Sequence, residues 1–125
     1  MTELKAPFTV DTFDASAYDE PADGPPLGRA RLTKTYTGPL VGTATLEMLT
    51  CGQEGYTAIE RFVGTFGDRA GSVAFLHGGL MGGPYGEAGE TFAHVVPGSG
   101  TGGLAGMTGR GVIEHGLLTL DYDLT

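Results

Sequence analysis

The chain has 125 residues, which suffices for one domain around one modest core, so we expect residues 1–125 to form a single β-barrel domain. It carries 15 acidic and 7 basic residues, a formal net charge of −8, and it has no cluster of Lys and Arg. Because a phosphate backbone must be neutralised by clustered basic residues, nucleic acid and anionic membrane surfaces are not expected as partners.

Cysteine use and hydropathy predict a cytoplasmic protein. Cys51 is the only cysteine, so no internal disulfide forms. The first five residues lack the apolar run of a signal peptide, and no segment approaches the roughly 20 apolar residues that a membrane-spanning helix needs.

The predicted elements are all strands. Glycine accounts for 23 residues without a fixed period, and no segment shows an apolar helical stripe between caps, so no substantial helix is expected. Phe8, Val10 and Phe13 mark a first strand, and the proline-rich segment 19–28 after it is predicted to be a loop. The remaining predicted strands cover residues 30–36, 40–49, 56–65, 72–77, 91–96, 110–115 and 118–124, with a hairpin loop at 67–71 and a loose loop at 78–89.

Seven or eight sequential strands with short connections predict an all-β fold, a closed antiparallel up-and-down barrel of about eight strands. Closing the sheet removes its exposed edges. An open sandwich of two sheets is the alternative architecture.

Three of these strands carry a titratable residue on an otherwise apolar face. Lys34 shares its face with Ala30, Leu32 and Tyr36; Glu60 shares its face with Tyr56, Ala58 and Phe62; His77 shares its face with Val73 and Phe75. Glu47 is ambiguous, because its face holds Val41 and Leu49 but also Thr43 and Thr45. If all four faces line one lumen, Lys34, Glu47, Glu60 and His77 converge, and Lys34 and Glu60 need each other or equivalent partners.

Two interpretations of this convergence stay open. In the first, the charged residues form an ionic network that fixes strand register, or they lie at the rim of the barrel and reach water. In the second, an acid–base group lies in an apolar pocket, where desolvation raises the pKa of its carboxyl and suits it to proton transfer.

Other motifs predict no further chemistry. Gly98, Gly100 and Gly103 match G-x-G-x-x-G, but the glycine-rich segment that follows cannot form the helix which a nucleotide site requires. The three histidines have no metal-ligand spacing, so no metal is expected, and the nucleophile motif G-x-S-x-G is absent.

Four segments carry a resemblance to a known family: RLTKTYTG at 31–38, IERFVGT at 59–65, GSVAFLH at 71–77 and VPGSGTG at 96–102. From about residue 8 to residue 124 the chain resembles a family of small bacterial proteins of unknown function, whose fold is similar to the allene oxide cyclase and dirigent barrels. The resemblance implies a barrel of about eight strands with a lumen, and assembly through the barrel wall into a dimer or trimer. The cyclase and dirigent proteins bind an apolar reactive molecule and steer its ring closure or coupling without a cofactor.

The leading hypothesis is therefore a barrel that binds a small apolar molecule in its lumen. If it is an enzyme, we expect a cofactor-free isomerase or cyclase, in which Glu60 is the acid or base, Lys34 its charge partner, and His77 and Tyr36 orient the reacting groups. The remaining candidate ligand contacts are Leu32, Glu47, Tyr56, Phe62 and Phe75.

The alternative is a non-catalytic barrel, filled by its own side chains, that acts through protein–protein contact or oligomerisation. Lumen volume separates the two hypotheses. A cavity of roughly 300 Å³ or more that Glu60 faces favours a ligand, whereas a lumen plugged by Tyr36, Phe62, Phe75 and Tyr122 excludes a ligand there.

Overall fold

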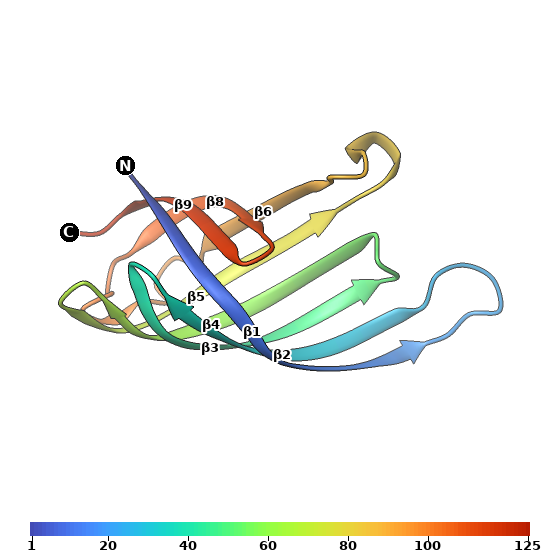
Figure 1. The fold of residues 1–125 in the computed structure, drawn as a ribbon, viewed down its shortest axis with the longest axis horizontal. Coiled ribbons are helices and arrows are strands. Elements are labelled where there is room, and N and C mark those ends of the chain that lie inside the picture. The colour runs from blue at the N-terminus through green and yellow to red at the C-terminus, as the bar shows by residue number, and fades with distance from the viewer.

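The chain is almost entirely β-strand. The computed structural model describes all residues, Met1–Thr125. Its elements in chain order are β1 (Thr2–Asp19), β2 (Leu27–Thr37), β3 (Leu40–Cys51), β4 (Gly55–Phe66), β5 (Arg69–Leu80), a 3-10 turn η1 (Gly83–Tyr85), β6 (Glu90–Val95), β7 (Thr101–Gly102), β8 (Thr108–Glu114) and β9 (Leu117–Asp123) (Figure 1). No helix is long and apolar enough to cross a membrane.

The strands form a closed antiparallel barrel, as predicted. β1 to β6 pair in sequence order, β6 pairs with β8, β8 with β9, and β9 with β1, which closes a ring of eight strands. The short strand β7 pairs with Gly71 and Ser72 of β5, on the same edge as β6 and beyond its end. The sandwich alternative is thereby excluded.

Several strands are longer than the alternation predicts. β1 begins at Thr2 and continues to Asp19, well beyond the predicted Phe8–Phe13 core of the strand. β5 continues to Leu80, so the first residues of the predicted loop 78–89 are paired with both β4 and β6. The reason is that ladder hydrogen bonds from two neighbouring strands stabilise extended backbone even at glycine, whose own strand propensity is low.

Only one half of the barrel is enclosed by all eight strands. β9 pairs with β1 over Thr2–Pro7, and the last bond on this edge runs from the Phe8 N–H to the Gly116 carbonyl at 3.0 Å. In Figure 1 the β8–β9 hairpin ends midway along the molecule, while β1 to β6 continue past it. We call the enclosed part the closed half, and the far ends of β1 to β6, beyond Phe8 on β1, the open half.

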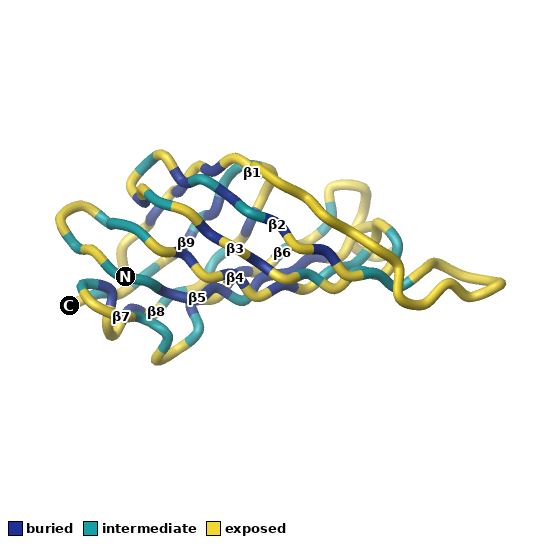
Figure 2. The backbone as a smooth tube through the Cα atoms, turned by 90° about the horizontal axis from the view of Figure 1, so that it is seen from below, coloured by how far each residue is buried: buried dark blue, intermediate teal, exposed yellow.

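Two apolar clusters occupy these halves. The larger contains 16 buried residues, including Tyr36, Phe62 and Phe75, and fills the closed half. The smaller contains Ala30, Leu32, Leu46 and Ala58 on the inner face of the open half, with Met48 and Tyr56 packed against it. Figure 2 shows that buried positions follow the strands through both halves, whereas the far end of β1 and its loop to β2 are exposed throughout.

A row of glycines crosses the inner face of the closed half. Gly42, Gly64, Gly71 and Gly102 are successive cross-strand partners on β3, β4, β5 and β7. A Cβ atom at Gly64 would lie 2.1 Å from a carbonyl oxygen of β3 and 2.9 Å from the Phe62 ring. The backbones approach this closely only because side chains are absent, which bends the sheet here and leaves the space to aromatic rings.

Candidate functional site

A buried cluster of polar side chains joins β2, β4 and β5. The Lys34 Nζ atom lies 2.8 Å from Glu60 Oε1, and His77 Nε2 lies 2.9 Å from the same oxygen. The Tyr36 hydroxyl donates to Glu60 Oε2 at 2.5 Å. The exposed fractions of Lys34, Glu60 and His77 are 3%, 0% and 2%. The predicted convergence of these three residues, and the pairing of Lys34 with Glu60, are confirmed.

Strand alternation sets the depth of this cluster. Along β4, Ala58 belongs to the apolar cluster of the open half and Phe62 to that of the closed half, so Glu60 lies at the boundary. Along β2, Leu32 and Tyr36 flank Lys34 in the same way. The cluster is therefore a polar layer between the two halves, on the side chains that face inward with period two.

The carboxyl of Glu60 is held in its ionised form. Burial acts to raise the pKa of this carboxyl, but the hydrogen bond from His77, the charge of Lys34 and the hydrogen bonds from Lys34 and Tyr36 together hold that pKa below its ordinary value. Of the two interpretations left open by the sequence, the paired ionic network agrees with this direction, whereas the acid–base interpretation considered desolvation alone and not the three donors. A carboxylate stabilised in this way is a weak general base and is not a proton donor near neutral pH.

The remaining partners are also shifted by burial. Burial lowers the pKa of the Lys34 ammonium, and the Glu60 carboxylate opposes that shift. Burial and the Glu60 charge both raise the pKa of the Tyr36 hydroxyl, which keeps it a hydrogen-bond donor. Lys34 Nζ also lies 4.0 Å from the centroid of the Phe8 ring, a cation–π contact. No buried side-chain nitrogen or oxygen lacks a partner, so the layer is satisfied without a ligand.

Tyr56 connects this layer to the open half. Its hydroxyl lies 3.3 Å from His77 Nδ1, and the two rings meet edge-on with centroids 5.8 Å apart. Burial and the Glu60 charge raise the pKa of the Tyr56 hydroxyl to about 12. Tyr56 is only partly buried, whereas Lys34, Tyr36, Glu60 and His77 are fully buried. Tyr56 is thus the member of the cluster that a molecule in the open half can reach.

Glu47 lies on the outer face of the barrel, and the expectation that it joins the cluster is corrected. The inner face of β3 carries Leu46 and Met48, so Glu47 between them points outward. Its Oε2 atom accepts a hydrogen bond from Arg31 Nε at 3.0 Å on the exposed wall. The ambiguity arose because the outer face of β3 holds Val41 and Leu49 beside its threonines, so side-chain polarity did not distinguish the two faces.

The interior of the closed half is packed with the barrel's own side chains. Phe62 and Phe75 are completely buried, Tyr36 packs edge-on against Phe62 with centroids 5.4 Å apart, and Tyr122 packs against the same cluster. The four residues that would plug a lumen do fill this half. Leu32 and Tyr56, in contrast, lie in the open half.

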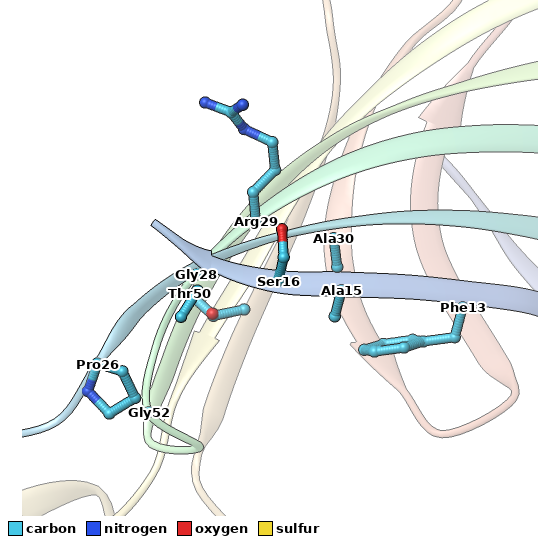
Figure 3. A pocket seen from close by; sticks show the side chains of 10 residues that line it. Phe13, Ala15, Ser16, Pro26, Gly28, Arg29, Ala30, Thr50 and Gly52 are labelled. Carbon is cyan, nitrogen blue, oxygen red and sulfur yellow. The ribbon is translucent and has the colours of Figure 1, made fainter. Parts of the chain in front are cut away.

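The open half carries a pocket of about 310 Å³ where β1, β2 and β3 end. Its lining consists mainly of small and apolar residues: Phe13, Ala15, Ser16, Ala17, Pro26, Gly28, Arg29, Ala30, Thr50 and Gly52. Figure 3 shows Phe13 and Ala15 projecting to one side of β1, with Ser16 and Arg29 projecting to the other. This pocket was not predicted from the sequence, although the alternation from Phe13 through Ala15 to Ala17 continues the apolar face of the first strand.

A second pocket, of about 260 Å³, lies at the opposite end of the barrel beside Phe66, Gly67, Arg69, Tyr122 and Leu124. The Arg69 guanidinium already donates to the carbonyl oxygens of Gly103 and Thr125, at 3.4 and 3.1 Å. Glu60 lines neither pocket. No group of three or more His, Cys, Asp or Glu side chains is placed to hold a metal ion.

The sequence matches a protein family over almost the whole chain. A family model described as "Protein of unknown function (DUF3224)" matches residues 4–125. The chain belongs to this family. The resemblance to a family of proteins of unknown function is thereby confirmed.

One solved member of the DUF3224 family is similar throughout. The crystal structure of a protein of unknown function from Shewanella oneidensis MR-1 shares 32% sequence identity and aligns with a TM-score of 0.79. The alignment covers 100% of this chain and 98% of that one. No curated protein matches the chain. The comparisons thus give the family and the fold, and they give no activity.

Proposed function

We propose that this protein binds a small, largely apolar molecule on the inner face of the open half of its barrel. The pocket of about 310 Å³ carries this proposal. Its volume lies at the lower end of the roughly 300–1,000 Å³ found for small-molecule sites. Alanine, glycine, proline and phenylalanine dominate its lining, which suits an apolar surface more than a charged one.

Access to this site follows from the incomplete wall. β9 stops pairing with β1 at Pro7, so the rest of β1 has β2 as its only ladder partner. A molecule can therefore approach the inner face from the side of β1 that has no neighbouring strand, without passing through the filled closed half. The ligand-in-the-lumen hypothesis is thus restricted to the open half.

The polar layer supports a binding role better than a catalytic one. Both oxygens of Glu60 are engaged, Oε1 by Lys34 and His77 and Oε2 by Tyr36, and none of its surface is exposed. A cofactor-free isomerase or cyclase would need one of these groups to exchange a proton with the substrate. Only Tyr56 is placed to touch a substrate, so in the catalytic form of this proposal Glu60, Lys34 and His77 act through Tyr56 and not directly.

The experiment is native mass spectrometry of the protein purified gently from its own host, followed by release and identification of small molecules. We expect a stoichiometric apolar compound in the wild type. Ala15→Leu, which fills the pocket from β1, should lose it, and Thr57→Leu, on the exposed outer face of β4, should retain it. If the wild type is empty and also binds no 1-naphthol, the proposal fails.

A second candidate function is assembly through the barrel wall, as in the alternative hypothesis of a filled barrel. Four large apolar side chains on the outer face of β3 and β4 are about half exposed: Val41, Leu49, Ile59 and Val63. By register they form two diagonal pairs, Val41 with Val63 and Leu49 with Ile59, and these exposed apolar pairs suit the contacts of a dimer or trimer. Sedimentation velocity measures the oligomeric state directly. Ile59→Lys should shift an oligomer toward the monomer, and a monomeric wild type would exclude this function.

A further inference from the structure

The positions of the hydrogen atoms on Glu60 and His77 determine whether the Tyr56 hydroxyl acts as a donor or as an acceptor toward a ligand. Ionised Glu60 is an acceptor only, so the ring nitrogen of His77 that faces it, Nε2, carries a hydrogen. Glu60 and Lys34 already cancel each other's charge, and a second proton on His77 would leave one uncompensated positive charge in a fully buried site. His77 is therefore the neutral tautomer with its hydrogen on Nε2.

The second ring nitrogen then acts as an acceptor. With its hydrogen on Nε2, His77 has a free lone pair on Nδ1, and the Tyr56 hydroxyl at 3.3 Å donates into it. The raised pKa of Tyr56, about 12, agrees with a hydroxyl that keeps its hydrogen. The hydrogen of Tyr56 is thus committed to His77, and the lone pairs of its oxygen are free.

Tyr56 lies beside the pocket. On β3 its direct cross-strand partner is Thr50, which lines the pocket, and inward-facing partners of this kind have Cβ atoms about 4.5–5.5 Å apart. The charged residue at the pocket rim, Arg29, projects away from Phe13 and Ala15, and its guanidinium lies 5.9 Å from the centroid of the Tyr18 ring. No free cation therefore faces the inner surface next to Tyr56 to receive a carboxylate or phosphate.

We propose that the ligand is an uncharged apolar molecule that carries a hydroxyl or N–H group, and that Tyr56 recognises this group as a hydrogen-bond acceptor. The chain Glu60–His77–Tyr56 fixes this polarity from within the core. The inference rests on the proposed function, since it names the class of molecule that the open half takes. It also gives a role to the one partly buried residue, Tyr56, that joins the satisfied polar layer to an otherwise apolar surface.

The test compares three probes of nearly equal size and shape: 1-naphthol, which donates a hydrogen bond; 1-methoxynaphthalene, which does not; and 1-naphthaldehyde, which only accepts. Because the chain has no tryptophan, naphthalene fluorescence can be followed directly during titration. We expect the wild type to bind 1-naphthol about threefold to tenfold more tightly than the other two, the effect of one net hydrogen bond.

Two variants assign this preference to Tyr56. Tyr56→Phe should bind all three probes with similar affinity, because the acceptor oxygen is gone while the apolar surface stays. Tyr85→Phe, in the exposed turn η1, should keep the wild-type preference. Circular dichroism checks that both variants are folded. If Tyr56→Phe does not fold, the comparison of the three probes on the wild type still tests whether the site prefers a hydrogen-bond donor.

The outcomes separate this inference from the proposed function. If the wild type binds all three probes equally, or prefers the aldehyde, the polarity assigned to Tyr56 is wrong and the binding site in the open half still stands. If the preference persists in Tyr56→Phe, another group recognises the hydroxyl. If none of the three probes binds, the proposed function and this inference fail together.

Discussion

Replacing Glu60 by Gln tests the polar layer most directly. The substitution keeps the shape of the side chain and one acceptor oxygen, but it removes the negative charge that Lys34 faces at 2.8 Å. Three donors converge on this carboxylate, so at least one of them loses its acceptor. Lys34 is 3% exposed and has no other carboxylate within reach, so its ammonium becomes a buried charge without a counter-charge.

The cost follows from these contacts. Losing a hydrogen bond to a charged group costs about 1.5–3 kcal/mol, and breaking a buried ion pair by removing one partner costs about 3–5 kcal/mol in all. We expect Glu60→Gln to lower the free energy of unfolding by about 3–5 kcal/mol. Since a domain of this size is stable by only about 5–15 kcal/mol, the variant should be visibly less stable at room temperature.

Urea unfolding followed by circular dichroism measures this change, with Glu47→Gln as the matched control. Glu47 lies one strand away on the exposed outer face, and its replacement should leave the midpoint almost unchanged. The double variant Lys34→Met, Glu60→Gln should be more stable than Glu60→Gln alone, because it removes the unpaired charge. If Glu60→Gln unfolds at the same urea concentration as the wild type, Glu60 and Lys34 are not a buried ion pair and the site has been misread.

Three further expectations concern pH, the glycine row and the two halves. The folded protein holds the pKa of Glu60 below its ordinary value of 4.5, so the unfolded chain binds more protons at this position. The stability that ionised Glu60 contributes is therefore complete above pH 4.5 and is lost as the pH falls below it. The wild type should therefore lose more stability than Glu60→Gln between pH 5 and pH 3; parallel acid titrations of the two would count against this carboxylate. Gly64→Ala should lower the free energy of unfolding by about 1–3 kcal/mol or more, because its Cβ atom would clash with the backbone of β3. Gly55→Ala meets only the flexible tip of a leucine and should cost far less in the same urea assay. Equal losses would mean that the row of glycines is not needed for the close approach of the strands. Phe62→Ala should lower the free energy of unfolding by about 3–5 kcal/mol, because it empties part of the closed half. Phe13→Ala, at a residue that is 62% exposed, should cost a small fraction of that and should weaken 1-naphthol binding. An unchanged affinity of Phe13→Ala for 1-naphthol would show that Phe13 is not part of the site.

Much of the barrel could be predicted from the sequence, because alternation is a strong signal where one face is truly apolar. On β2, β4 and β5 a single polar residue interrupts a run of buried ones, so the inward direction of Lys34, Glu60 and His77 was readable. β3 lacks this contrast, since threonine and alanine are almost equally tolerated on either face. The side chain of Glu47 was consequently placed with the wrong set of residues.

The properties of the site depend on information that alternation does not contain. The pKa of Glu60 depends on how many donors reach it, and three strands supply those donors. The open half depends on strand length, because β8 and β9 have 7 residues each while β3, β4 and β5 have 12. The predicted strands 110–115 and 118–124 were already shorter than 40–49 and 56–65, so this mismatch was a usable signal for an incomplete wall.

The pairing of β1 with β9 also governs how the chain reaches its folded state. Thr2 pairs with Tyr122 and Pro7 with Leu117, so the barrel is sealed by residues from opposite ends of the chain. Contacts of such high sequence separation form late and slow the folding of small domains, because a long loop must be ordered before they add stability. During synthesis, β1 to β5 can pair as a growing meander, but β1 keeps an open edge until β9 has left the ribosome. Translation therefore exposes a strand edge that the finished protein covers over residues 2–7.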